Sequence, residues 1–97
     1  MVKHIILWKL REDIEKTEIP AVKSAAKAAL EGLFGKIDGL CEIRLKTESS
    51  NADMMLITVF KDEESLKGYQ KSPLHNAAAD KYVRPYTAQR LCFDFEE

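Results

Sequence analysis

The chain has 97 residues, which is enough for one domain and too few for two separate cores. Hydrophobic residues make up 45% of it and charged residues 32%, ordinary values that exclude a disordered chain. Fifteen basic and sixteen acidic residues nearly cancel, so we expect no nucleic-acid partner. No apolar run approaches the about 20 residues of a membrane span, and the start lacks the features of a secretory signal. We therefore expect a cytoplasmic protein without a membrane partner.

The first ten residues predict a β-strand at the centre of a sheet. Side chains alternate between the two faces of a strand. One face carries a titratable group, His4, among apolar residues, while Ile5 and Leu7 lie on the other face. Because both faces are apolar in the middle, the strand must be covered on both sides. The residues of the first face are Val2, His4, Ile6, Trp8 and Leu10.

The remaining residues predict two helical regions and three more strands. Apolar residues spaced by three and four predict an amphipathic helix over about 19–33. An alternating edge strand follows over 40–47, then a polar loop over 48–53 and a strand over 54–60 that is apolar on both faces. Asp62 caps a short helix, and Ser72-Pro73 starts another that runs to about residue 83. In the last strand, over about 89–95, Leu91, Phe93 and Phe95 share one face, opposite Cys92 and Asp94.

This order, β-α-β-β-α-β, predicts an α+β, ferredoxin-like fold. Two right-handed crossovers give an antiparallel sheet with strand order 4-1-3-2 and both helical regions on one face. The second face would remain bare although it is apolar, and an exposed apolar patch marks an interface. We therefore predict a homodimer in which two sheets pack face to face. The predicted interface residues are Ile5, Leu7, Met55, Ile57 and Val59.

The two cysteines, Cys41 and Cys92, lie inside predicted strands. Their low number argues against a disulfide scaffold, and we expect buried free thiols in a reducing compartment. Two histidines without a neighbouring cysteine or carboxylate pattern do not predict a metal site, and no glycine-rich phosphate loop is present. We therefore expect no metal and no cofactor.

Three short motifs in order resemble one known family. They are the opening VKHIILWKL, the turn GKIDGL and the block FKDEESLKGYQKSPLH. Together they span nearly the whole chain and resemble the stress-responsive dimeric α/β-barrel (Dabb) domain. The resemblance implies one such domain over 1–97. The resemblance implies a homodimer whose two sheets form one barrel, with a connection to stress responses. Many members of the family have no assigned activity.

The resemblance also implies which residues form a site. One relative, olivetolic acid cyclase, closes a polyketide ring with a histidine and a tyrosine in a pocket between helices and sheet. Tyr69 and His75 match that pair, and His4 matches a histidine of the first strand. Ile6, Trp8 and Met54 would line the pocket. Met54 stands where the cyclase has another histidine, so the resemblance implies a small-molecule pocket more strongly than ring closure.

Elementary chemistry is consistent with such a role for these side chains. His75 would be the third residue of its helix, where the helix dipole disfavours imidazolium, and a neutral imidazole can accept a proton. A tyrosine hydroxyl beside it could stabilise an enolate. Alternatively, Tyr69 packs its ring, His75 bonds locally and His4 is a satisfied core histidine.

Three functional hypotheses stay open from the sequence. The first is a homodimer that binds a small apolar or aromatic molecule. The second is a cofactor-free enzyme, cyclase-like or monooxygenase-like, that uses His75 and Tyr69. The third is a structural stress protein without a ligand. A cavity of roughly 300 Å³ beside these residues would favour the first two, and a filled interior the third.

Overall fold

The computed structural model describes residues 1–49 and 51–97. Ser50, within the loop predicted over 48–53, lies outside the described residues. None of the helices in the described ranges is long and apolar enough to cross a membrane. The elements are β1 (Val2–Leu10), α1 (Ile19–Glu31), β2 (Leu40–Lys46), β3 (Met54–Phe60), α2 (Glu63–Lys71), α3 (Pro73–Tyr82), a 3₁₀ turn (Arg84–Tyr86) and β4 (Thr87–Glu96).

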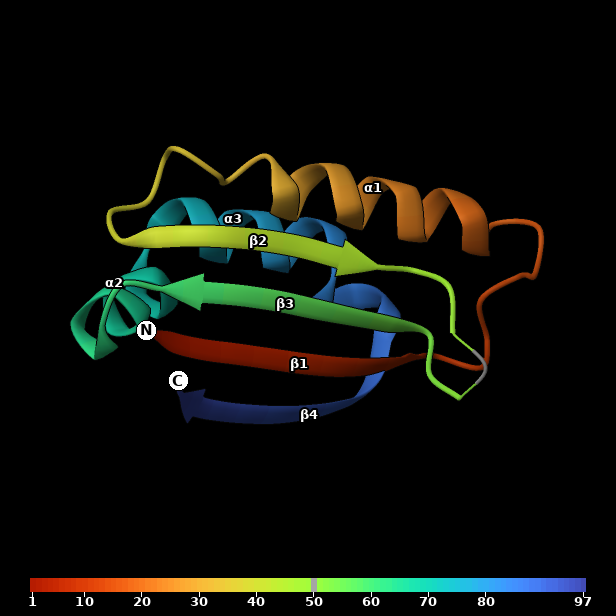
Figure 1. The fold of residues 1–97 in the computed structure, drawn as a ribbon. Helices are drawn as coiled ribbons and strands as arrows, with labels where there is room; N and C mark the ends of the chain where they lie inside the picture. The colour runs from red at the N-terminus through yellow and green to blue at the C-terminus, as the bar shows by residue number, and fades with distance from the viewer. Residues whose placement is uncertain (50) are drawn as a thin grey trace.

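The four strands form one antiparallel sheet in the order β2-β3-β1-β4. The predicted ferredoxin-like topology is therefore confirmed, and the helices cover one face of the sheet (Figure 1). β1 lies between β3 and β4, as its two apolar faces require. The chain ends lie side by side, with Val2 of β1 opposite Glu96 of β4 (Figure 1).

The hydrophobic core lies between the helices and the sheet. Its largest fully buried side chains include Tyr69 of α2, Phe60 of β3 and Leu30 of α1. His4 lies within this layer with only 1% of its surface exposed. The buried hydroxyl of Thr58 donates to the carbonyl oxygen of His4 at 2.6 Å, so the hydroxyl is satisfied without another partner.

The opposite face of the sheet carries an uncovered group of apolar side chains. On β1, Ile5 lies opposite Ile57 and Phe93, and Leu7 lies opposite Met55 and Leu91. We call these six residues the outer patch. Leu91 and Phe93, which the sequence analysis did not include in the interface, are 71% and 68% exposed. Val59 of the predicted interface is already buried within the single chain.

The prediction of buried cysteines was wrong. Both Cys41 and Cys92 are exposed free thiols. On β2 the pairing with β3 shifts between Leu40 and Glu42, and this β-bulge turns Cys41 away from the core. Cys92 lies on β4, an edge strand whose residues are nearly all exposed.

Gly39 determines how closely α2 approaches the start of β2. Its φ of +79° is a conformation that side chains disfavour, and a Cβ there would come within 1.9 Å of the Ser65 hydroxyl oxygen and 2.4 Å of its Cβ. Gly68, in the middle of α2, is exposed and has nothing within 4 Å of an added Cβ. Substitution by alanine should therefore have opposite effects on stability at the two glycines.

We expect Gly39→Ala to lower the free energy of unfolding by more than about 1 kcal/mol, because it strains the backbone and displaces α2. Gly68→Ala, the matched control, should raise it by about 0.4–1 kcal/mol, because it removes a flexible residue from a helix interior. Urea unfolding of the two variants measures both effects. Equal stability of Gly39→Ala and the unchanged chain would contradict the role of Gly39 in the close approach of α2 to the start of β2.

Candidate functional site

A small cavity of about 90 Å³ lies between the sheet and the helices α2 and α3. Of the residues that the sequence analysis placed in a site, His4, Tyr69 and His75 all line it, together with Ile6 and Trp8. Met54 does not line this cavity but is buried in the core. The cavity is smaller than the roughly 300 Å³ expected for a drug-sized ligand. The interior is thus neither a large pocket nor completely filled.

A break in the helical backbone brings Tyr69 and His75 together. α2 ends at Lys71, and the extended backbone of Ser72 separates it from Pro73, the first residue of α3. The side-chain amide of Asn76 donates to the carbonyl oxygens of Ser72 (3.1 Å) and Gln70 (3.2 Å), and its backbone N–H also donates to that of Ser72 (3.0 Å). The Tyr69 and His75 rings lie close together, with their centroids 4.1 Å apart and their planes tilted by 34°.

Tyr69 buries its hydroxyl without a hydrogen-bond partner among the described residues. The residue is fully buried, and its ring packs against Phe60 with the ring centroids 5.0 Å apart. Burial raises the pKa of Tyr69 far above its usual range, opposed by the charges of Arg84 and Arg90. The group is therefore a neutral phenol that can donate a hydrogen bond and lacks a group to receive it.

His75 presents a second unsatisfied atom. Its Nδ1 is buried and has no hydrogen-bond partner within the described ranges. Burial lowers the pKa of His75 to about 4, and the nearby charge of Arg84 is the next cause. The direction agrees with the neutral imidazole expected from the sequence, with burial as the main reason. At neutral pH the ring is uncharged, so it can exchange a proton with a bound molecule.

His4 has a partner that the sequence analysis missed. Its Nδ1 is hydrogen-bonded to the carboxylate of Asp94, which lies directly opposite on β4. Since a carboxylate only accepts, this bond places the proton of a neutral His4 on Nδ1 and leaves Nε2 as an acceptor. The ring of His4 meets that of Tyr69 edge-on, with their centroids 6.4 Å apart. Asp94 therefore holds His4 in one orientation at the cavity.

The thiol of Cys92 completes a group of three possible metal ligands with His4 and Asp94. Its sulfur lies 3.5 Å from Nδ1 of His4 and 3.3 Å from Oδ1 of Asp94, and the three ligand atoms lie within 4.8 Å of one another. Burial first, and then Asp94, raises the pKa of the Cys92 thiol, which disfavours the thiolate that a metal requires. The hydrogen bonds of Asp94 with His4 and with the Cys92 thiol account for the closeness of this group.

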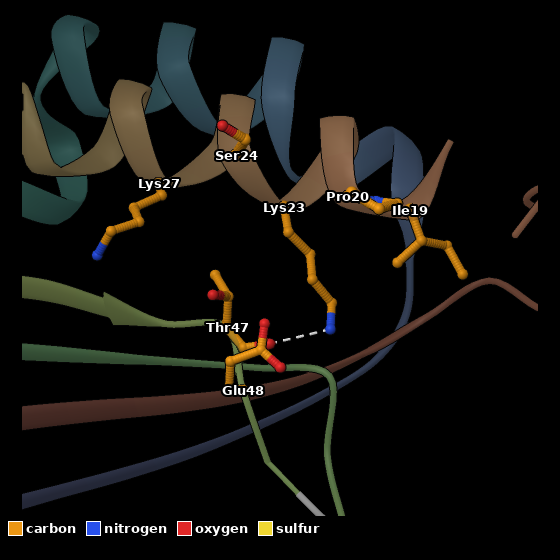
Figure 2. Close-up of a pocket in the computed structure, with 7 residues that line it drawn as sticks. All are labelled: Ile19, Pro20, Lys23, Ser24, Lys27, Thr47 and Glu48. Carbon is orange, nitrogen blue, oxygen red and sulfur yellow. Dashed lines mark hydrogen bonds between the residues drawn. The ribbon is translucent and has the colours of Figure 1, made fainter. Parts of the chain in front are cut away.

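A second, more open hollow of about 290 Å³ lies between α1 and the end of β2. Figure 2 shows Lys23 and Lys27 pointing from α1 towards this strand end. Lys23 Nζ donates to the carbonyl oxygen of Thr47 and Lys27 Nζ to that of Leu45, each at 3.0 Å. The lysines thus tie α1 to the edge of the sheet. Their contacts give this hollow a structural role.

The fold agrees with a comparison against protein families. The family model for the stress responsive A/B barrel domain matches residues 2–97. The chain therefore belongs to the stress responsive A/B barrel (Dabb) family. A search of curated proteins finds no match.

Several solved structures are similar to this chain. A dimeric protein of unknown function with a ferredoxin-like fold from Bacteroides fragilis is 31% identical, with a TM-score of 0.90 over 99% of this chain and 95% of that one. A dimeric ferredoxin-like protein of unknown function from Jannaschia sp. is 19% identical, with a TM-score of 0.80 over 99% and 98%. A hydroxynitrile lyase from Passiflora edulis is 12% identical, with a TM-score of 0.71 over 97% and 90%. The last two show the fold alone.

Proposed function

We propose that the chain works as a homodimer whose two sheets pack through the outer patch. A group of exposed apolar side chains on one sheet face supports this proposal, because such a patch marks an interface. The protein from Bacteroides fragilis, at 31% identity, is described as dimeric. Two exposed free thiols suit a reducing compartment, so we place the dimer in the cytoplasm.

Phe93→Glu tests the dimer, because it places a charge within the outer patch, on the edge strand β4. Phe93 is 68% exposed in the single chain, so the change should leave the fold intact. In the dimer the charge would be buried without a partner, at a cost of roughly 3–5 kcal/mol. Sedimentation should show a dimer for the unchanged chain and folded monomers for the variant.

Phe34→Glu is the matched control for this prediction. Phe34 is 59% exposed and lies in the connection between α1 and β2, outside the strands of the sheet. Its replacement should leave the dimer unchanged. A folded monomer of the unchanged chain at micromolar concentration, or equal dissociation of both variants, would exclude the outer patch as the interface.

We further propose that each subunit binds a small aromatic or apolar molecule at the cavity beside Tyr69 and His75. One observation carries this proposal: two buried polar atoms, the Tyr69 hydroxyl oxygen and Nδ1 of His75, share the cavity region and have no hydrogen-bond partner among the described residues. Buried polar groups are nearly always satisfied, and a ligand oxygen would supply the missing contacts. The 90 Å³ volume admits one polar end of the molecule, while the remainder lies at the mouth.

An enzymatic role is the second candidate, and the protonation states favour it. A neutral His75 can take a proton from a bound carbonyl compound, and the neutral Tyr69 hydroxyl can donate to the oxygen on which charge develops. The second histidine at the cavity, His4, is oriented by Asp94 as a general base often is. The reaction class would be cofactor-free proton transfer next to a carbonyl group. A structural stress role without a ligand is the third candidate.

Tyr69→Phe separates these roles, because it removes only the unpaired hydroxyl. The free energy of unfolding should rise by roughly 1 kcal/mol, since a buried polar group without a partner is lost. Binding and any turnover should fall. A panel of small aromatic and polyketide-like carbonyl compounds, followed by nuclear magnetic resonance shifts and product analysis, measures the second effect.

His75→Ala completes this experiment by identifying the base. Turnover lost in His75→Ala but retained in Cys41→Ser, a change far from the cavity, would favour the enzyme. Binding without turnover would favour the ligand-binding dimer. If Tyr69→Phe destabilised the chain and no compound bound, the structural role would stand instead.

A further inference from the structure

We propose that the ligand of this cavity is an anion, namely a small aromatic carboxylic acid whose carboxylate enters between Tyr69 and two arginines. This inference rests on the proposed ligand-binding function and adds the chemical class. Arg84 of the 3₁₀ turn and Arg90 of β4 both line the cavity that His4, Tyr69 and His75 share. None of the residues that line it carries a carboxylate.

The two arginines reach the cavity from neighbouring elements. Arg90 pairs with Trp8 across β1 and β4, so it lies on the same sheet face as His4 and Asp94. Within the described part of the chain, Arg90 forms no ion pair. Arg84 is held by Asp80, one helical turn earlier, with which it forms an exposed ion pair. Arg90 also lies near the Cys92 thiol, where burial and Asp94 raise the pKa of the thiol and the charge of Arg90 lowers it. Among the described residues, the cavity therefore has one guanidinium in an ion pair and one outside any ion pair.

The charges of these arginines contribute a positive potential at the cavity, which the carboxylate of Asp80 partly opposes at His75. Both arginines lower the pKa of Tyr69 and that of His75, although one group is an acid and the other a base. Only a positive potential makes a phenol easier to ionise and an imidazole harder to protonate. The same potential favours a bound anion, and the low dielectric of a buried site strengthens it.

The size of the cavity limits which part of the ligand enters. Its 90 Å³ is less than the roughly 150 Å³ of a cavity known to hold benzene, so an aromatic ring does not fit inside. A carboxylate is smaller and has two acceptor oxygens. The Tyr69 hydroxyl can donate to one of them and an arginine to the other, which gives the orphan hydroxyl its partner. The ring of the ligand would remain at the mouth.

The test compares benzoate with benzamide, its neutral isostere, by isothermal titration calorimetry on the intact chain. We expect benzoate to bind roughly tenfold more tightly, because only the carboxylate forms charge-assisted hydrogen bonds with the arginines. Arg90→Gln should remove most of this difference by weakening benzoate binding and leaving benzamide binding nearly unchanged. Higher salt should weaken benzoate binding alone.

Lys81→Gln is the control for overall charge. Lys81 is an exposed cation on α3 that does not line this cavity. Equal loss of benzoate binding in Lys81→Gln and Arg90→Gln would overturn the inference, because the effect would then be non-specific. Equal binding of benzoate and benzamide would overturn the anion preference and leave the pocket intact. Binding of neither compound would contradict both the inference and the ligand site itself.

Discussion

The rest of the fold depends on one strand that is apolar on both faces. β1 cannot leave either face in water without losing the free energy that burial provides. The helices cover the face that carries Ile6 and Trp8, and they bury His4 together with these residues. The other face, with Ile5 and Leu7, remains without a cover in a single chain. Because both faces of β1 must be covered, the same strand explains why His4 is buried under the helices and why a second subunit is needed.

The second feature of the molecule is a pair of buried polar groups that have no hydrogen-bond partner among the described residues. A buried hydroxyl without a partner costs roughly 1–3 kcal/mol. Within the described residues, Tyr69 carries such a hydroxyl and His75 carries an unpaired nitrogen, and the break between α2 and α3 brings their rings together. A chain selected for stability alone would place an apolar residue at position 69. Unsatisfied groups that gather at a cavity are a common mark of a site that sacrifices stability for function.

Much of this arrangement could be predicted from the sequence, and the remainder depended on register. Hydrophobic spacing, turn residues and the handedness of the crossovers were sufficient for the strand order. The resemblance to the family placed Tyr69 and His75 together. Alternation also put Asp94 on the face of the last strand opposite Leu91 and Phe93, but it did not show which residue of β1 Asp94 faces. The partner of His4 was therefore missed, and so was the position of Arg90. Cys41 was misplaced because a β-bulge shifts the alternation by one residue, which the pattern alone does not reveal.

The protonation of His75, with and without a ligand, tests the central claim most directly. In the free protein, nuclear magnetic resonance should show a neutral ring above pH 5 and a titration midpoint near 4, because burial and Arg84 disfavour the charged form. Addition of benzoate should shift the Nδ1 signal of His75 as this atom gains a neighbour in the cavity, while signals near Cys41 stay unchanged. A midpoint near 6.5 together with ring signals that no ligand alters would show that His75 is an ordinary solvated histidine and would contradict the site.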